Sequence, residues 1–173
     1  MTMATDQREN TFLTFHLDQE VYGLGIVSVR EVLEYMPITK VPRTSECMCG
    51  LVNVRGQAVP VIDLRAVLGL KQAEATVETC IIIGEAEVQG DSSILGFLVD
   101  GVQEVVDISP EQIESAPRLG SRVNSECVSG IARLASQFVI LLSVQSVFAL
   151  QDVPQAAESD EERSYEGKEP ATG

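Results

Sequence analysis

The chain lacks tryptophan, contains a single histidine, and has only five phenylalanines and three tyrosines among its 173 residues. Hydrophobic residues still make up 45% of the sequence, so the interior must be aliphatic, and its Val, Ile and Leu content favours strands. His16 lies in an alternating segment that predicts a position on the surface of a strand. Without a second histidine, a phosphate-binding glycine loop or a nucleophile beside a base, no machinery for hydrolysis or phosphoryl transfer is visible. We therefore predict a protein that is not an enzyme and needs no cofactor.

Long hydrophobic runs are also missing. An apolar run such as residues 138–142 is far too short to cross a bilayer, which takes about 20 residues in a helix. The first residues have no apolar core of the kind that defines a signal peptide. These absences predict a cytoplasmic protein without direct membrane insertion.

Basic residues are scarce, because 12 Lys and Arg stand against 26 Asp and Glu, a net charge of −14. Residues 151–173 have a net charge of −5 and residues 1–10 of −1, which leaves −8 for residues 11–150. The polar composition of residues 151–173 predicts a disordered acidic tail, and we expect residues 1–10 to be flexible. A negative central region without a Lys/Arg cluster argues against nucleic acid as a partner, since binding phosphates requires cations.

Cysteines are few, at positions 47, 49, 80 and 127, and reduced thiols are expected in a cytoplasmic protein. Cys47 and Cys49 form the only close pair, which makes a poor zinc site in a chain with one histidine. Asp63 and Asp100 are single acids at strand ends, typical of caps or turns and not of a metal cluster. A thiol-based metal or redox protein using Cys47 and Cys49 remains an alternative, as does a small-ligand-binding β-barrel.

The segment 50–65 reads as a β-hairpin. Val52 and Val54 alternate with Asn53 and Arg55, which predicts one buried and one polar face. Gly56 then supplies the turn, and the strand resumes in the aliphatic residues that follow. Pro60 has no amide hydrogen to give to a neighbouring strand, so it predicts an edge or rim position.

Two segments of the chain repeat in the same order. Residues 23–32 match residues 96–105 at an offset of 73, and Pro37 then matches Pro110. Residues 50–57 and 61–64 match residues 130–137 and 141–144 at an offset of 80. Two ordered matches indicate an internal duplication.

Each copy contains several short strands with turn signals between them. The first copy predicts strands over 12–17, 20–26, 29–36, 51–55 and 58–63, and the second over 79–87, 94–99, 102–108, 129–134 and 137–143. Residues 64–70 and 144–150 predict short helices at the barrel ends. Strands at this spacing indicate an all-β protein of two similar barrels packed side by side, subdomains of about 11–70 and 78–150. The cleft between them would be a natural docking groove.

The duplication also separates residues of shared structural need from specialised ones. Gly23 matches Gly96 and Glu31 matches Glu104, which predicts a shared structural need at each of these positions, whereas Arg55 and Gly56 align with Ala135 and Ser136 in the second copy. The arginine at position 55 therefore needs an explanation other than a structural need shared by both copies. Because a guanidinium pairs with a carboxylate through two hydrogen bonds, we expect Arg55 to contact either Glu31 or a partner protein.

Three patterns carry a family resemblance. Residues 50–56 read Gly-aliphatic-x-Asn-aliphatic-Arg-Gly, residues 59–64 read aliphatic-Pro-aliphatic-aliphatic-Asp-Leu, and residues 96–102 read Gly-x-aliphatic-aliphatic-Asp-x-Val. With the duplication, they make residues 11–150 similar to the CheW family, the coupling proteins of bacterial chemosensory arrays. The family's fold is a pair of SH3-like five-stranded barrels, so the resemblance implies the same architecture here.

The resemblance also implies a function. It implies a non-enzymatic adaptor that binds the regulatory domain of the histidine kinase CheA and the cytoplasmic hairpin tip of chemoreceptors, and is thereby recruited to membrane-associated receptor arrays. By similarity, six residues fall at positions associated with receptor docking or with shaping its groove: Val29, Glu31, Arg55, Ile81, Val102 and Val105. Three more lie towards the kinase-binding end of the first barrel: Gly50, Val52 and Gly56.

Overall fold

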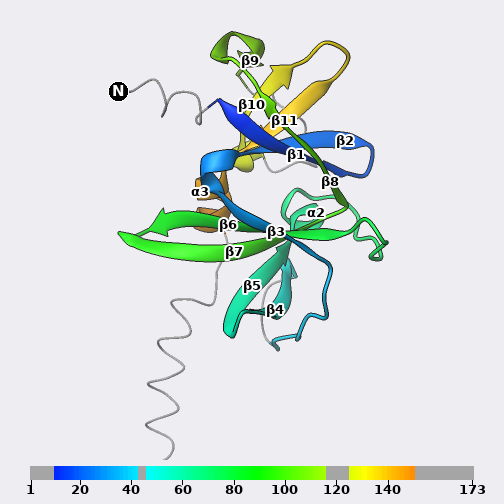
Figure 1. The fold of residues 1–173 in the computed structure, drawn as a ribbon, viewed down its shortest axis with the longest axis vertical. Helices are drawn as coiled ribbons and strands as arrows, with labels where there is room; N and C mark the ends of the chain where they lie inside the picture. The colour runs from blue at the N-terminus through cyan, green and yellow to red at the C-terminus, as the bar shows by residue number, and fades with distance from the viewer. Residues whose placement is uncertain (1–9, 43–45, 116–124, 151–173) are drawn as a thin grey trace, which may run out of the picture.

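The computed structural model describes residues 10–42, 46–115 and 125–150, and it consists of two β-sheets with two short helices between them (Figure 1). The expected acidic tail and all of the expected N-terminal segment except Asn10 lie outside the described residues. The strands are β1 (Thr11–Leu17), β2 (Glu20–Gly25), β3 (Val29–Glu34), β4 (Met48–Val54), β5 (Gln57–Asp63), β6 (Cys80–Val88), β7 (Asp91–Val99), β8 (Gly101–Asp107), β9 (Ile113–Glu114), β10 (Val128–Arg133) and β11 (Phe138–Leu142). The helices are α2 (Leu64–Val67) and α3 (Val144–Leu150), with 3-10 turns η1 (Ile26–Ser28), η2 (Pro110–Gln112) and η3 (Ser125–Cys127).

Every strand predicted from the sequence is present, with ends shifted by at most three residues. The two-residue strand β9 was not predicted. The mainly β architecture with short helices is thus confirmed, whereas closure of each sheet into a five-stranded barrel stays a prediction.

Each sheet draws strands from both copies of the repeat. The six-stranded sheet has the order β8-β1-β2-β11-β10-β9, and the five-stranded sheet has the order β3-β6-β7-β5-β4. The chain crosses from the first sheet to the second between β2 and β3, and back between β7 and β8. The predicted halves 11–70 and 78–150 therefore each contribute strands to both sheets.

The two sheets have the same internal order once the copies are matched. β3-β6-β7-β5-β4 corresponds strand by strand to β8-β1-β2-β11-β10. In each sheet a glycine lies in the parallel pair: Gly23 opposite Leu141, and Gly96 opposite Val61. An added Cβ at either glycine would come within 3.0 Å of a neighbouring side chain. The prediction that these two glycines serve a shared structural need is confirmed.

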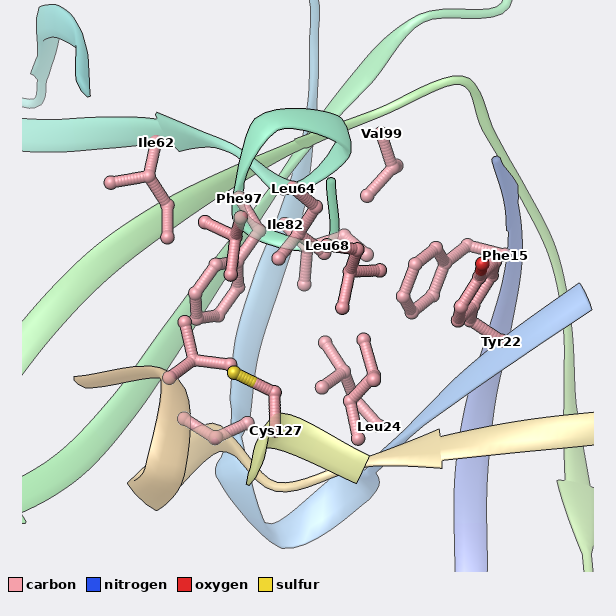
Figure 2. Close-up of a cluster of buried hydrophobic side chains, with 14 of the residues drawn as sticks. Phe15, Tyr22, Leu24, Ile62, Leu64, Leu68, Ile82, Phe97, Val99 and Cys127 are labelled. Carbon is pink, nitrogen blue, oxygen red and sulfur yellow. The ribbon is translucent and has the colours of Figure 1, made fainter. Parts of the chain in front are cut away.

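The largest apolar cluster lies between the two sheets (Figure 2). Phe15 and Leu24 come from the six-stranded sheet, Ile82 and Phe97 from the five-stranded one, and Leu68 follows α2; all five are at most 1% exposed. A smaller cluster lies on the opposite face of each sheet, as the alternation of Ile81 and Ile83 with Ile82 along β6 shows. The central cluster makes one structural unit of the two sheets, since burying an aliphatic or aromatic side chain contributes about 1.5–3 kcal/mol.

Pro60 corrects one expectation, because β5 lies inside its sheet between β7 and β4. The register explains how a proline is tolerated there. Leu51, which lies opposite Pro60 on β4, exchanges its backbone hydrogen bonds with Thr39, and the parallel pairing of β5 with β7 begins only at Val61. No neighbouring strand therefore requires an N–H group from Pro60.

Both predicted helices are present, but α2 is shorter than the predicted 64–70. Asp63 caps its first turn by accepting a hydrogen bond from the backbone N–H of Arg65 at 3.0 Å, which confirms the expected cap. Gly69 has a φ of +84°, a left-handed conformation typical of a residue that ends a helix. No helix in the described ranges is long and apolar enough to span a membrane.

Candidate docking surface

β3 and β8 occupy equivalent places in the two sheets. Each is an edge strand, with β6 or β1 as its neighbour, and each is the first strand after the chain changes sheets. Val32 on β3 and Val105 on β8, which match in the repeat, are 40% and 54% exposed. The two strands thus present apolar side chains to solvent at corresponding positions.

Val29 and Val102 lie at the starts of the same two strands. Both are partly buried and pack against the central cluster. The space between the sheets, where we expected a docking groove, is filled by that cluster and by the two helices. A partner can therefore contact β3 and β8 at the surface, while the interior between the sheets is already occupied.

The turn between β4 and β5 has an unusual backbone. Val54 pairs with Gln57, so Arg55 and Gly56 form a two-residue loop, with φ of 53° and 85°. Positive φ at both positions defines a type I′ turn, which favours Asn-Gly, and an arginine there costs roughly 1 kcal/mol. The side chain of Asn53 accepts a hydrogen bond from the backbone N–H of Gly56 at 2.8 Å. This strained turn holds Arg55 at the tip of the hairpin.

Arg55 and Glu31 form a bidentate ion pair. The two guanidinium nitrogens donate to the two carboxylate oxygens of Glu31 at 2.7 and 2.6 Å. This hydrogen bonding holds the pKa of Glu31 below its usual range and raises the pKa of Arg55. Of the two predicted contacts for Arg55, the one with Glu31 is confirmed, and it joins the hairpin tip to β3.

Glu104, the counterpart of Glu31, behaves differently. The hydroxyl of Thr14 donates to the backbone oxygen of Glu104 at 2.7 Å and accepts from its backbone N–H at 3.1 Å. The carboxylate of Glu104 is exposed and forms no ion pair with any described residue. The expectation that both glutamate side chains serve the same structural purpose is therefore wrong.

Three of the predicted docking residues are buried. Ile81 and Val52 are 0% and 2% exposed, in the cluster of the five-stranded sheet. Gly50 is buried with a φ of 144°, and an added Cβ would lie 2.1 Å from the backbone oxygen of Thr39. These residues can shape a docking surface only by supporting it. Gly56, in contrast, lies in the exposed hairpin turn.

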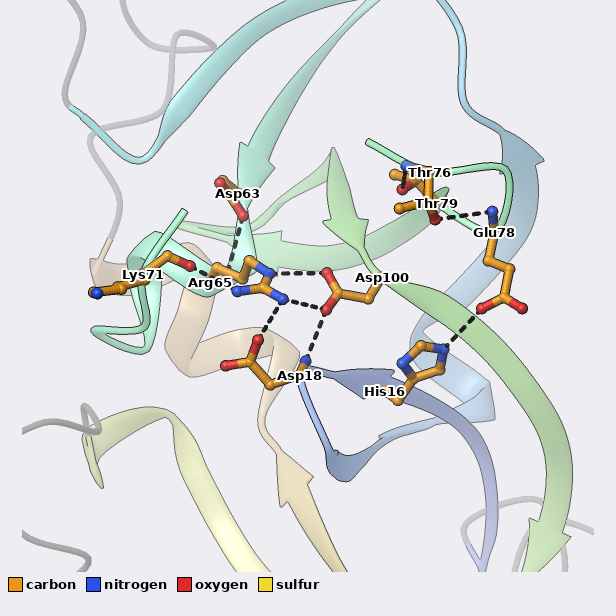
Figure 3. A network of polar contacts seen from close by, with 9 residues as sticks. All are labelled: His16, Asp18, Asp63, Arg65, Lys71, Thr76, Glu78, Thr79 and Asp100. Atoms are coloured by element: carbon orange, nitrogen blue, oxygen red, sulfur yellow. Dashed lines mark hydrogen bonds and ion pairs between the residues drawn. The ribbon is translucent and has the colours of Figure 1, made fainter. Parts of the chain in front are cut away.

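A buried arginine, which the sequence reasoning did not single out, connects the two sheets (Figure 3). Arg65 of α2 has a side chain only 10% exposed, and it donates to Asp100 from Nε at 2.9 Å and from Nη2 at 2.5 Å. It also donates to Asp18, in the β1–β2 turn, and to the backbone oxygen of Lys71. Asp100 in turn accepts a hydrogen bond from the backbone N–H of Asp18 at 2.7 Å.

This cluster, which we call the Arg65 clamp, consists of Arg65, Asp18 and Asp100. Asp100 directly precedes β8, so the clamp fixes the start of one candidate docking strand relative to the helix that follows β5. His16 lies nearby on β1, partly exposed and 3.6 Å from Glu78. No local pattern in the sequence pairs positions 65 and 100, because the contact depends on how the sheets are shared between the two copies.

The cysteine environment does not favour thiolate chemistry. Burial raises the pKa of Cys47, and burial with a smaller effect of Asp63 raises that of Cys49 to about 12. Metal ligation and nucleophilic attack both need the thiolate, which such a shift disfavours.

A cavity of about 410 Å³ lies beside Cys49 and Asp63. Within the described ranges, no group of three or more His, Cys, Asp or Glu side chains is placed to hold a metal ion.

Comparison with known proteins gives a consistent match. A model of the CheW-like domain matches residues 11–152. The chemotaxis protein CheW of Klebsiella aerogenes is 31% identical over 145 residues, 82% of this chain and 83% of that protein. The probable chemotaxis protein CheW of Rhizobium etli is 28% identical over 146 residues, 84% of this chain and 92% of that protein. The crystal structure of the scaffolding protein TtCheW from Thermoanaerobacter tengcongensis superposes with a TM-score of 0.71 at 33% identity, covering 82% of this chain and 94% of that one.

Proposed function

The chain belongs to the CheW family of non-enzymatic chemotaxis scaffold proteins, and from this membership we propose that it couples chemoreceptors to the histidine kinase CheA through two surfaces. The exposed edge strands β3 and β8 would contact the cytoplasmic hairpin tip of a receptor. The β4–β5 hairpin end would contact the regulatory domain of the kinase. The observation that carries the proposal is the pair of equivalent edge strands with exposed valines, Val32 and Val105.

The receptor surface fits an amphipathic helix. Val105 and Val32 supply apolar contact area, and the partly buried Val29 and Val102 support it from below. An amphipathic helix binds by placing its apolar face against such a surface. Arg55 and Glu31 add a rigid polar group beside β3, and Ile81 supports that strand from the interior.

The kinase surface lies at the other edge of the five-stranded sheet. β4 is the last strand of that sheet, and apart from Leu51, whose backbone groups pair with Thr39, its edge can offer backbone groups for pairing with another protein. Val52 and Gly50 are buried in β4 and set its shape, while Gly56 is exposed in the adjoining turn. We assign the kinase contact to β4 because it is a separate edge strand from β3 and β8, whereas Arg55 at the hairpin tip pairs with Glu31 of β3 and belongs to the receptor surface.

Barrel closure would bring the two surfaces into one rigid frame. The pairing of Thr39 with Leu51 brings the chain after β3 to β4, at the opposite edge of the sheet. The Arg55–Glu31 ion pair spans the same two edges. In the other sheet, β9 pairs with β10 after β8 has paired with β1. These contacts support two five-stranded barrels.

Coupling requires more than simultaneous binding. A scaffold that bound the active and inactive kinase states equally would shift neither population. The protein must therefore make contacts that differ between those states. Its recruitment to membrane-associated arrays would depend on the receptor, with the protein itself remaining on the cytoplasmic side.

Co-sedimentation with membranes tests both partners at once. The protein is mixed with receptor-containing membranes, with and without the kinase, and with matched membranes that lack receptors. We expect it to pellet only with receptors, and to increase the amount of kinase that pellets. Equal pelleting with receptor-free membranes, or no effect on the kinase, would contradict the proposal.

A further inference from the structure

The internal duplication allows the residues of β8 to be compared with their counterparts on β3. Val29, Glu31 and Val32 on β3 correspond to Val102, Glu104 and Val105 on β8. Each strand has an irregularity in its register at the glutamate, between Val29 and Glu31 on β3 and opposite Leu13 and Phe15 on β8. The two glutamates therefore occupy the same place on equivalent edge strands.

Among the described residues, only the first copy provides a cation for its glutamate. Glu31 receives two hydrogen bonds from Arg55, at the tip of the β4–β5 hairpin. The corresponding turn between β10 and β11 has Ala135 and Ser136 instead. Arg133, on the same hairpin, is already engaged, because it donates to Glu114 and lies 5.7 Å from the ring centre of Phe138.

The backbone of Glu104 is nevertheless fixed in place. The buried Thr14 hydroxyl bonds both its N–H and its carbonyl oxygen, so the exposed carboxylate projects from a held position. A carboxylate held in this way matches an arginine, whose guanidinium binds a carboxylate through two hydrogen bonds.

We propose that Glu104 binds an arginine of the receptor tip, so that the partner supplies to β8 the cation that Arg55 supplies to β3. This inference rests on the proposed receptor contact and specifies its chemistry. The arginine pairs with Glu104 as Arg55 pairs with Glu31. Lysine would bind less well, since its ammonium is a single point charge without the planar fork.

Binding of the full chain to a receptor cytoplasmic fragment tests the inference. Glu104→Gln keeps the size of the side chain and removes its charge, and we expect it to weaken binding about tenfold, as for a charge-assisted hydrogen bond. Glu111→Gln on η2 makes the same change in net charge outside β8 and should leave affinity within about twofold. Thermal unfolding of both variants checks that the fold is retained.

A charge exchange identifies the partner residue. Glu104→Arg should abolish most binding, and substitution of one receptor arginine by glutamate should restore it. Wild-type affinity in Glu104→Gln, or failure of every receptor arginine-to-glutamate change to restore Glu104→Arg, would overturn the inference. Absence of receptor binding by the wild-type protein would instead contradict the proposed function itself, so the two failures are distinguishable.

Discussion

Arg65 and Asp100, from different copies of the repeat, share two hydrogen bonds at 2.9 and 2.5 Å. Asp18 adds a third link, from the β1–β2 turn to the same guanidinium. The clamp thus joins the end of β5, the β1–β2 turn and the start of β8, three points that are far apart in the sequence. One buried cation thus adds to the central apolar cluster in fixing the relative placement of the two sheets.

Removing that cation should destabilise the fold. We expect Arg65→Ala to lower the free energy of unfolding by about 2–4 kcal/mol, because Asp100 and Asp18 would then repel each other without a counter-charge. Arg30→Ala is the matched control, since Arg30 is 52% exposed and lies 3.5 Å from Glu85. Such a surface pair contributes about 1 kcal/mol or less. Urea unfolding at neutral pH measures both, and equal losses would contradict the clamp's role.

Acid should weaken the same clamp. Burial raises the pKa of Asp100, but hydrogen bonds from Arg65 and from the N–H of Asp18 outweigh it and hold that pKa below its usual value. Such a carboxylate stabilises the fold above its unfolded pKa, and the contribution is lost as the pH falls through the folded value. We expect the free energy of unfolding to decrease below about pH 4, and less steeply in Asp100→Asn. Urea unfolding at several pH values measures this loss for both proteins. If the free energy of unfolding fell equally steeply with pH in both, Asp100 would not be the source of the acid sensitivity.

Gly50→Ala tests a close backbone approach. Its Cβ would lie 2.1 Å from the Thr39 oxygen, at a φ of +144°, so we expect a loss of about 2–4 kcal/mol in the free energy of unfolding. Gly25→Ala is the control, because its Cβ would meet nothing nearer than 3.9 Å. Thermal unfolding measures the stability of the two variants relative to the wild-type protein. A Gly50→Ala protein as stable as the control would contradict the requirement for glycine at this close approach.

Arg55→Ala should weaken receptor binding while the protein stays folded. The substitution frees Glu31 and removes the guanidinium from the hairpin tip, and we expect an affinity loss of about tenfold, measured by calorimetry with a receptor fragment. Arg133→Ala makes the same change on the equivalent hairpin of the second copy, where its partner is Glu114. A similar loss in both variants would mean that receptor binding does not depend specifically on Arg55.

The apolar part of the site is best tested at Val105. Val102→Glu would weaken docking, but Val102 packs against the central cluster, so a charge there also destabilises the fold. Val105→Glu places the charge on a side chain that is 54% exposed. We expect at least a tenfold loss of receptor affinity, in the range seen for interface anchors, with an unchanged unfolding temperature. Unchanged affinity would remove Val105 from the docking surface.

Local patterns in the sequence were enough to locate the strands and the repeat. Gly23 and Gly96 could be matched because both copies need a residue without a side chain at this position in the parallel pair of strands. A further match was present but missed: Cys47 and Cys127, also 80 apart, accept equivalent backbone hydrogen bonds from Asp63 and Ser143. Extending the alignment by three residues would have found it.

The sharing of strands between copies could not be predicted in the same way. A strand has the same alternation whether it pairs within its own copy or with the other one, so the pattern around β3 or β8 does not identify its sheet. The Arg65–Asp100 contact follows from that sharing and was hidden with it. The Arg55–Glu31 contact was predictable because both residues lie in one copy and one of them has no counterpart.

The shared sheets also determine the order in which the protein can fold as it is made. Synthesis proceeds from the N-terminus at about 5–20 residues per second, so β1 and β2 leave the ribosome well before β8 and β11, between which they lie. Until then their outer edges have no native neighbour. The five-stranded sheet needs only residues 29–99 and can form while the chain is still growing. The sheet that contains the first strands to be made is therefore the last to be completed.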